Sequence, residues 1–121
     1  MNVVPMKPLA HWYVTLTLAG EPWPEQEISD ALQRLMEERP LLQSCRYSAD
    51  TLELRYWEQA EDVEDAAALA LRLWSEHRKS AGLPDWQLVG LEVVDRDTFH
   101  RRLEGAHFMT APVVSAEVRP L

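Results

Sequence analysis

The amino-acid sequence predicts a small α+β fold, and three observations lead to that class. Residues 52–57 alternate between two unlike faces, which is the period of a β-strand. Residues 63–77 repeat instead at helical spacing, with alanines prominent in one stripe. Residues 86–94 alternate again. The chain therefore contains a strand, a helix and a second strand in direct succession.

The predicted ends of this helix support the assignment. Asp62 can accept hydrogen bonds from the free amides of the first turn, where Glu64 and Asp65 also meet the positive end of the helix dipole. Gly82 suits the left-handed position that follows a last turn, and Pro84 prevents the helix from continuing. Periodicity and end chemistry thus agree.

Another strand and another helix are expected before this stretch. The strand covers residues 12–18, and Gly20 follows it. Pro24 suits the first position of the helix, and Pro40 ends the helix at Arg39. One face of the strand consists of Trp12, Val14, Leu16 and Leu18, and the other consists of Tyr13, Thr15 and Thr17.

A further strand is expected at residues 41–47, joined by a tight turn to the strand that begins near residue 52. A two-residue or four-residue turn gives the same cross-strand pairs. The expected pairs are Tyr47 with Leu52, Cys45 with Leu54, Arg46 with Glu53 and Leu42 with Trp57. After Val94 the sequence predicts a short helix capped by Asp95 or Asp97, with Phe99 and Leu103 facing inward.

A chain of 121 residues has the length of one domain with one modest core, and its hydrophobic content of 46% is that of a globular protein. We expect a single domain over residues 1–121, with the core at about 11–94 and a C-terminal appendage at 95–121. The appendage contains a brief apolar segment, Val113 and Val114, but no clear period.

The order strand, helix, strand, strand, helix, strand is that of the ferredoxin-like βαββαβ unit. Right-handed crossovers place both helices on one face of a four-stranded antiparallel sheet. Under the helices we expect Leu16, Leu54, Val89 and Leu91. On the open face we expect Tyr13, Thr15, Thr17, Arg55, Trp57, Trp86 and Leu88.

A longer pattern joins two runs, SADTLELRYWEQAEDVEDAAALALRLWSE and LPDWQLVGLEVVDRDTFHRRLE. The pattern is a strand, an acidic cap, an alanine-rich helix, an LPxW strand and a final helix with spaced Arg and Leu. In this the chain resembles the small ferredoxin-like domains common in high-GC actinobacteria, over about two thirds of its length. Many of those proteins continue into a helix-turn-helix. This sequence departs from them at PVVSAEVRPL, so the resemblance does not imply DNA binding.

The net charge of −8 argues against nucleic acid, because phosphate contacts require Lys and Arg. The densest basic group, Arg96, Arg101 and Arg102, is diluted by neighbouring acidic residues. No apolar run is long enough to span a membrane, and the N-terminal residues lack the apolar segment of a signal peptide. We therefore expect a cytoplasmic protein without a membrane partner.

No motif indicates a catalytic, metal or cofactor site. Cys45 is expected beneath the helices, where a thiol behaves as a small hydrophobe. The four glycines are scattered, so they form no phosphate-binding loop. The histidines lack the i, i+3 or i, i+4 spacing of metal ligands, and they are His11, His77, His100 and His107. We predict no catalytic residue, no metal and no cofactor.

The five tryptophans are the one unusual feature of the sequence, and two of them fall on the predicted open face beside Tyr13. We predict a binding surface that consists of Tyr13, Arg55, Trp57 and Trp86. Exposed aromatic patches mark interfaces and ligand surfaces, so a homodimer or another protein is the expected partner. The alternative is that the C-terminal appendage covers these aromatics within the same chain.

Three functions are compatible with these predictions. We favour a non-catalytic interaction or regulatory module that uses the open sheet face and forms a homo-oligomer. A small-molecule enzyme of the dimeric ferredoxin-like type is an alternative, but the sequence shows no set of acid, base and nucleophile for it. Single-stranded nucleic-acid binding through Tyr13 and Trp57 is a further alternative, which the net charge of −8 disfavours.

Overall fold

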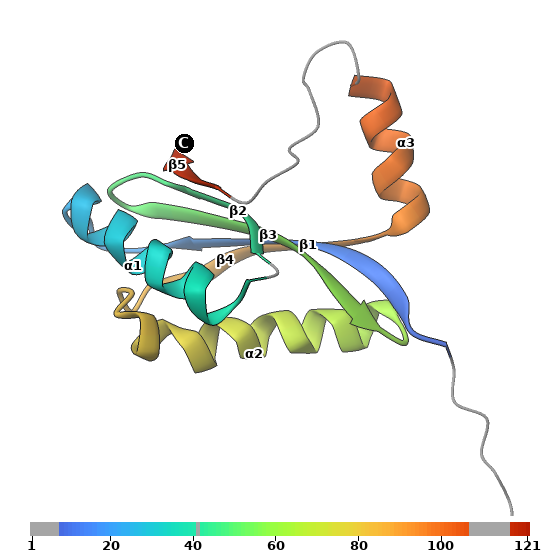
Figure 1. Ribbon diagram of the computed structural model, residues 1–121, viewed down its shortest axis with the longest axis horizontal. Helices are drawn as coiled ribbons and strands as arrows, with labels where there is room; N and C mark the ends of the chain where they lie inside the picture. The colour runs from blue at the N-terminus through green and yellow to red at the C-terminus, as the bar shows by residue number, and fades with distance from the viewer. Residues whose placement is uncertain (1–7, 41, 107–116) are drawn as a thin grey trace, which may run out of the picture.

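Strands and helices follow one another in the order β1 α1 β2 β3 α2 β4 α3 β5 (Figure 1). The structure is a computed structural model that describes residues 8–40, 42–106 and 117–121. The strands are β1 (Ala10–Ala19), β2 (Leu42–Tyr47), β3 (Thr51–Ala60), β4 (Gln87–Asp95) and β5 (Glu117–Pro120). The helices are α1 (Glu25–Glu38), α2 (Val63–Ala81) and α3 (Arg96–Ala106). The mixed α+β class predicted from the sequence is confirmed.

The sheet has five strands in the order β4-β1-β3-β2-β5. The pairs β1–β4, β1–β3 and β2–β3 are antiparallel, whereas β5 lies parallel to β2. The prediction of a four-stranded antiparallel sheet is therefore wrong in the number of strands and in the direction of the last pair. Four residues are too few to show a strand period, so β5 could not be found by alternation. Val113 and Val114 lie outside the described residues.

Helices lie on both sides of this sheet (Figure 1). α1 and α2 pack on one face, and α3 extends from the end of β4 on the other side. Apolar side chains from β1, β2 and β3 meet α1 and α2 in one core. Its fully buried members include Val14, Leu16, Leu18, Ile28, Leu32, Leu35, Cys45, Leu52 and Leu54. Of the helices described, none combines the length and the apolar character that crossing a membrane requires.

The β2–β3 hairpin has the predicted register over most of its length. Tyr47 pairs with Leu52, Cys45 with Leu54 and Arg46 with Glu53. The exception is Leu42, which pairs with Tyr56 and not with Trp57, because the register shifts between Leu42 and Ser44. Leu42 therefore lies on the core face, where it is 2% exposed.

The helix ends follow the predicted chemistry. Asp62 caps α2, and its side chain accepts a 2.9 Å hydrogen bond from the amide of Asp65. Gly82 follows α2 with a φ of 77°, the left-handed conformation that glycine adopts without strain. Pro24 is the cap residue of α1, one position before the predicted one. Asp95 caps α3 through a 2.7 Å bond from the amide of Thr98.

Strand β4 is where the predicted faces are wrong. Its register against β1 shifts between Thr17 and Leu18, and one extra residue in β4 reverses the alternation of side chains. Leu88, predicted on the open face, packs against the core, whereas Val89, predicted in the core, is 62% exposed. Leu91 is 39% exposed because β4 is the edge strand of the sheet.

Candidate functional site

The open face of the sheet, opposite α1 and α2, presents side chains in rows across three strands. Tyr13 of β1 pairs with Trp57 of β3 and with Val94 of β4. In the next row, Thr15 pairs with Arg55 and with Glu92. Paired residues of a sheet point to the same side, so an aromatic row lies beside a polar row.

Helix α3 covers the aromatic row. The capping bond to Asp95 starts the helix directly after β4, which brings Phe99 over the sheet. The ring centroid of Phe99 lies 4.5 Å from that of Tyr13 and 4.8 Å from that of Trp57, and the latter two are 5.0 Å apart. These spacings are typical of favourable aromatic contacts. Part of the predicted aromatic surface is thus covered within the same chain, as the alternative interpretation expected.

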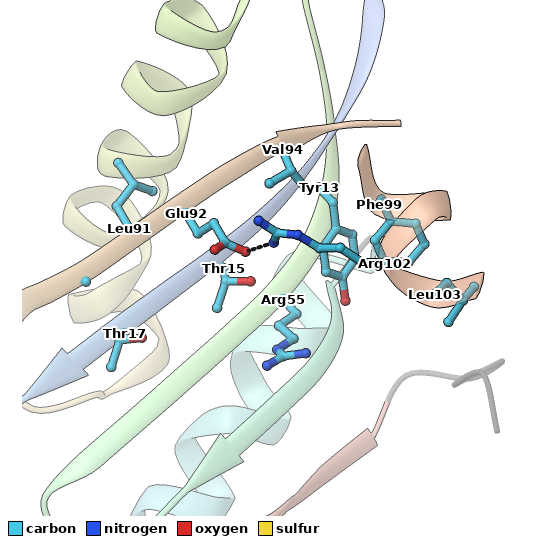
Figure 2. A pocket seen from close by; sticks show the side chains of 11 residues that line it. Tyr13, Thr15, Thr17, Arg55, Leu91, Glu92, Val94, Phe99, Arg102 and Leu103 are labelled. Carbon is cyan, nitrogen blue, oxygen red and sulfur yellow. Dashed lines mark hydrogen bonds and ion pairs between the residues drawn. The ribbon is translucent and has the colours of Figure 1, made fainter. Parts of the chain in front are cut away.

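A groove of about 540 Å³ remains between α3 and the open face (Figure 2). We call it the α3 groove. The end beside α3 has apolar walls and the other end has mainly polar side chains. The apolar walls are formed by Tyr13, Val94, Phe99 and Leu103, and the polar lining comprises Thr15, Thr17, Arg55, Glu92 and Arg102. Leu91 borders the polar end, where it pairs with the core residue Leu16.

Both arginines of the α3 groove form ion pairs, Arg102 with Glu92 of the same lining and Arg55 with Glu53, which is not part of that lining. Nε of Arg55 lies 2.8 Å from a carboxylate oxygen of Glu53, and Nη1 of Arg102 lies 2.8 Å from one of Glu92. The second pair joins α3 to β4 and is exposed on both sides, 58% for Arg102 and 55% for Glu92. The Arg102–Glu92 pair is weak because it is exposed to solvent, whereas the Arg55–Glu53 pair is partly buried.

Tyr13 occupies the junction of the apolar and polar ends. Burial raises the pKa of its phenol, and the positive charge of Arg55 opposes part of that increase. The phenol is therefore neutral at physiological pH and can donate a hydrogen bond into the α3 groove.

The structure brings together three of the four predicted binding residues. Tyr13 and Arg55 line the α3 groove. Trp57 packs on Phe99 and also lines a smaller hollow of about 320 Å³. Trp86 is not on this face, which corrects the prediction.

Trp86 is 4% exposed and belongs to the core. Its indole Nε1 donates a 2.8 Å hydrogen bond to the carbonyl of Glu21, and its own carbonyl accepts one of 3.1 Å from Nε1 of Trp74. The register shift in β4 explains the error, because alternation counted back from Val89 assigns Trp86 to the wrong face.

Of the described residues that line the α3 groove, only Tyr13 and Arg55 belong to the predicted binding surface, and the charged residues Glu92 and Arg102 are among those that it lacks. Arg102 lies three residues after Phe99, so both occupy one side of α3. This spacing is the feature of the sequence from which a shared position of Phe99 and Arg102 could be predicted. The sequence does not show which strand the helix faces, so it places Arg102 only in a basic group diluted by acidic residues.

The residues that the structure describes do not support a metal site or a reactive thiol. Among those residues, no three His, Cys, Asp or Glu side chains are placed to share a metal ion. His107 lies outside them. Cys45 is fully buried, and burial raises its pKa to about 12.

Burial should protect Cys45 from thiol reagents. At pH 8 we expect an aromatic disulfide reagent to label native protein far more slowly than protein in denaturant, because a thiolate is the reacting species. Raising the pH from 7 to 9 should accelerate labelling of the denatured chain, whose thiol has an ordinary pKa of about 8.5. Absorbance of the released thiol measures both rates. Rapid labelling of native protein would contradict the burial of Cys45.

Comparisons with known proteins give one match. Residues 11–110 match the model of a family described as a domain of unknown function, DUF8830. No curated protein and no solved structure matches the chain. The matched region contains every described side chain of the α3 groove. On this match, which covers most of its length, the chain belongs to the DUF8830 family.

Proposed function

We propose that this chain is a non-catalytic binding module whose ligand is a small molecule held in the α3 groove. The observation that carries the proposal is the groove itself, with a volume of about 540 Å³ on the face opposite the core helices. Ligand pockets in proteins have volumes of about 300–1,000 Å³ and combine apolar walls with a few polar groups. The α3 groove has both features.

The side chains in the α3 groove support binding more than catalysis. Its described lining includes no His or Cys, and its one carboxylate, Glu92, is paired with Arg102. Burial raises the pKa of Tyr13, so its phenol stays protonated at physiological pH and does not supply a base. Arginine stays protonated in proteins and does not exchange protons with a substrate.

Two further proposals concern the fold type and the partner. The order β4-β1-β3-β2, with α1 and α2 on one face, supports a ferredoxin-like unit extended by β5. The homodimer expected from the sequence stays a prediction. Since α3 covers the aromatic row, the surface that best supports self-association is the edge strand β4, where Val89 is exposed.

Amide NMR spectra test the small-molecule site. We expect a set of small aromatic fragments, added at millimolar concentration, to shift amide signals of Tyr13, Gly90 and Leu103 in preference to those of α2. Replacement of Thr15 by Trp should abolish these shifts, because Thr15 is half-buried in the middle of the groove. Fragments that shift no amide of the groove would contradict the proposal.

The matched control adds the same indole on the far side of the molecule. Leu71 of α2 is 47% exposed and lies on the helix layer away from α3. Leu71→Trp should leave the fragment-induced shifts unchanged. Equal loss of shifts in both variants would mean that the added indole acts through the fold and not by filling the groove.

A further inference from the structure

We propose that the ligand of the α3 groove is a small organic anion with an aromatic body. Its anionic group lies over Thr15 between Arg55 and Arg102, and its ring lies toward Phe99. This inference rests on the proposed function, because it assigns a chemical class to the ligand of that same groove.

The position of the anionic group follows from the sheet register. Thr15 of β1 pairs with Arg55 on one side and with Glu92 on the other, and Arg102 binds Glu92 from α3. Figure 2 shows Arg102 beside Glu92 on one side of Thr15 and Arg55 on the other. Two guanidinium groups from different elements thus flank one hydroxyl.

Both arginines have N–H groups that their ion pairs do not use and that can donate hydrogen bonds to a ligand. The ion pairs described above use Nε of Arg55 and Nη1 of Arg102, whereas a guanidinium has five N–H donors in a planar fork. The fork matches the oxygens of a carboxylate or phosphate better than any neutral group. Glu53 and Glu92 hold the two forks in place, so a bound anion finds them already oriented.

The aromatic body follows from the next residues along the same surface. Tyr13 precedes Thr15 by two residues on β1, so the two side chains leave the sheet about 7 Å apart. Phe99 lies over Tyr13 with a ring separation of 4.5 Å, and Leu103 continues that wall one turn later. A ring one or two bonds from the anionic group spans this distance and meets the aromatic wall.

Hydroxyl groups complete the polar end. Tyr13 and Thr15 both line the groove and both can donate to an oxygen anion. A neutral ligand of the same shape would find these hydroxyls but would form no charge-assisted pair with the N–H groups of Arg55 and Arg102 that their ion pairs with Glu53 and Glu92 leave unused. The polar end therefore favours an anion over its neutral counterpart.

Four probes of related shape test the inference by amide NMR titration of the full chain. They are phenylacetate, its neutral counterpart phenylacetamide, acetate and phenyl phosphate. We expect phenylacetate or phenyl phosphate to bind about ten-fold more tightly than phenylacetamide, as charge-assisted hydrogen bonds predict. Acetate should bind more weakly than phenylacetate because it lacks the ring. The ratio of phenylacetate to phenyl phosphate shows which anion the arginines prefer.

Variants identify the arginines. Arg102→Gln and Arg55→Gln should reduce phenylacetate binding to the level of phenylacetamide and leave phenylacetamide binding unchanged. Arg101→Gln is the matched control, because Arg101 is exposed on the same helix and is not part of the described lining. It should bind phenylacetate as the wild type does. Thermal melts confirm that each variant is folded.

The outcomes separate this inference from the proposed function. Phenylacetamide that shifts the groove amides as tightly as phenylacetate would overturn the anionic class and leave the binding module intact. Acetate that binds as tightly as phenylacetate would overturn the aromatic body. Failure of all four probes to shift any groove amide would contradict both proposals together.

Discussion

Replacement of Trp86 by alanine is expected to lower the free energy of unfolding by about 3–5 kcal/mol, the usual cost of removing a buried tryptophan. The side chain is 4% exposed and its indole N–H is bonded to the carbonyl of Glu21. Packing around it is dense: a Cβ on Gly20 would lie 2.9 Å from Cγ of Trp86, nearer than Cβ atoms approach other atoms in proteins. Truncation therefore leaves a cavity and removes the hydrogen bond between the indole and Glu21.

Trp57→Ala is the matched control for this measurement. Trp57 is half-buried on the open face and contacts Phe99 of α3. We expect a smaller loss of stability from Trp57→Ala than from Trp86→Ala in urea denaturation. Equal losses, or a larger loss at Trp57, would mean that Trp86 lies on a surface, as the uninterrupted alternation of β4 had predicted.

Replacement of Leu54 by alanine is expected to cost about 2–5 kcal/mol. Leu54 is fully buried on β3, between Leu16 of β1 and Cys45 of β2. It lies under the helices in the centre of the core, where neighbouring strands cannot collapse into the space left by the side chain.

An exposed leucine supplies the comparison for Leu54. Leu71 of α2 is 47% exposed, so Leu71→Ala should change stability by only about 0.5 kcal/mol or less. Midpoints and slopes from urea denaturation give both values. If Leu54→Ala unfolded at the same urea concentration as Leu71→Ala, the assignment of Leu54 to the core would be wrong.

Local signals in the sequence were reliable where the structure depends on neighbours in the chain. The Asp62 cap, the Gly82 end and the Tyr47–Leu52 pair all involve residues within a few positions of one another. Their geometry depends on hydrogen bonds and backbone conformations within one short segment, so distant residues are not needed to predict it.

Features that depend on distant contacts could not be predicted in this way. The extra residue in β4 is defined by the pairing of β4 with β1, about seventy residues earlier, and it reverses the faces that uninterrupted alternation gives to Trp86, Leu88 and Val89. The angle at which α3 returns over the sheet likewise depends on the contact between Phe99 and Tyr13. The sequence therefore predicted Tyr13 and Arg55 as site residues but not Arg102, whose place is set by that angle.

Strand β1 comes first among the described strands but lies inside the sheet, between β3 and β4. As the ribosome releases the chain, Trp12 emerges long before its partners Glu58 and Asp95. The β2–β3 hairpin can form as soon as its own residues are available, because its contacts are close in sequence. Until β4 is synthesised, one edge of β1 has no hydrogen-bonding partner, and its side chains are not fully covered. An exposed strand edge of this kind can pair with another chain. Nascent chains arrested before residue 95 are thus the form of this protein most prone to misassembly.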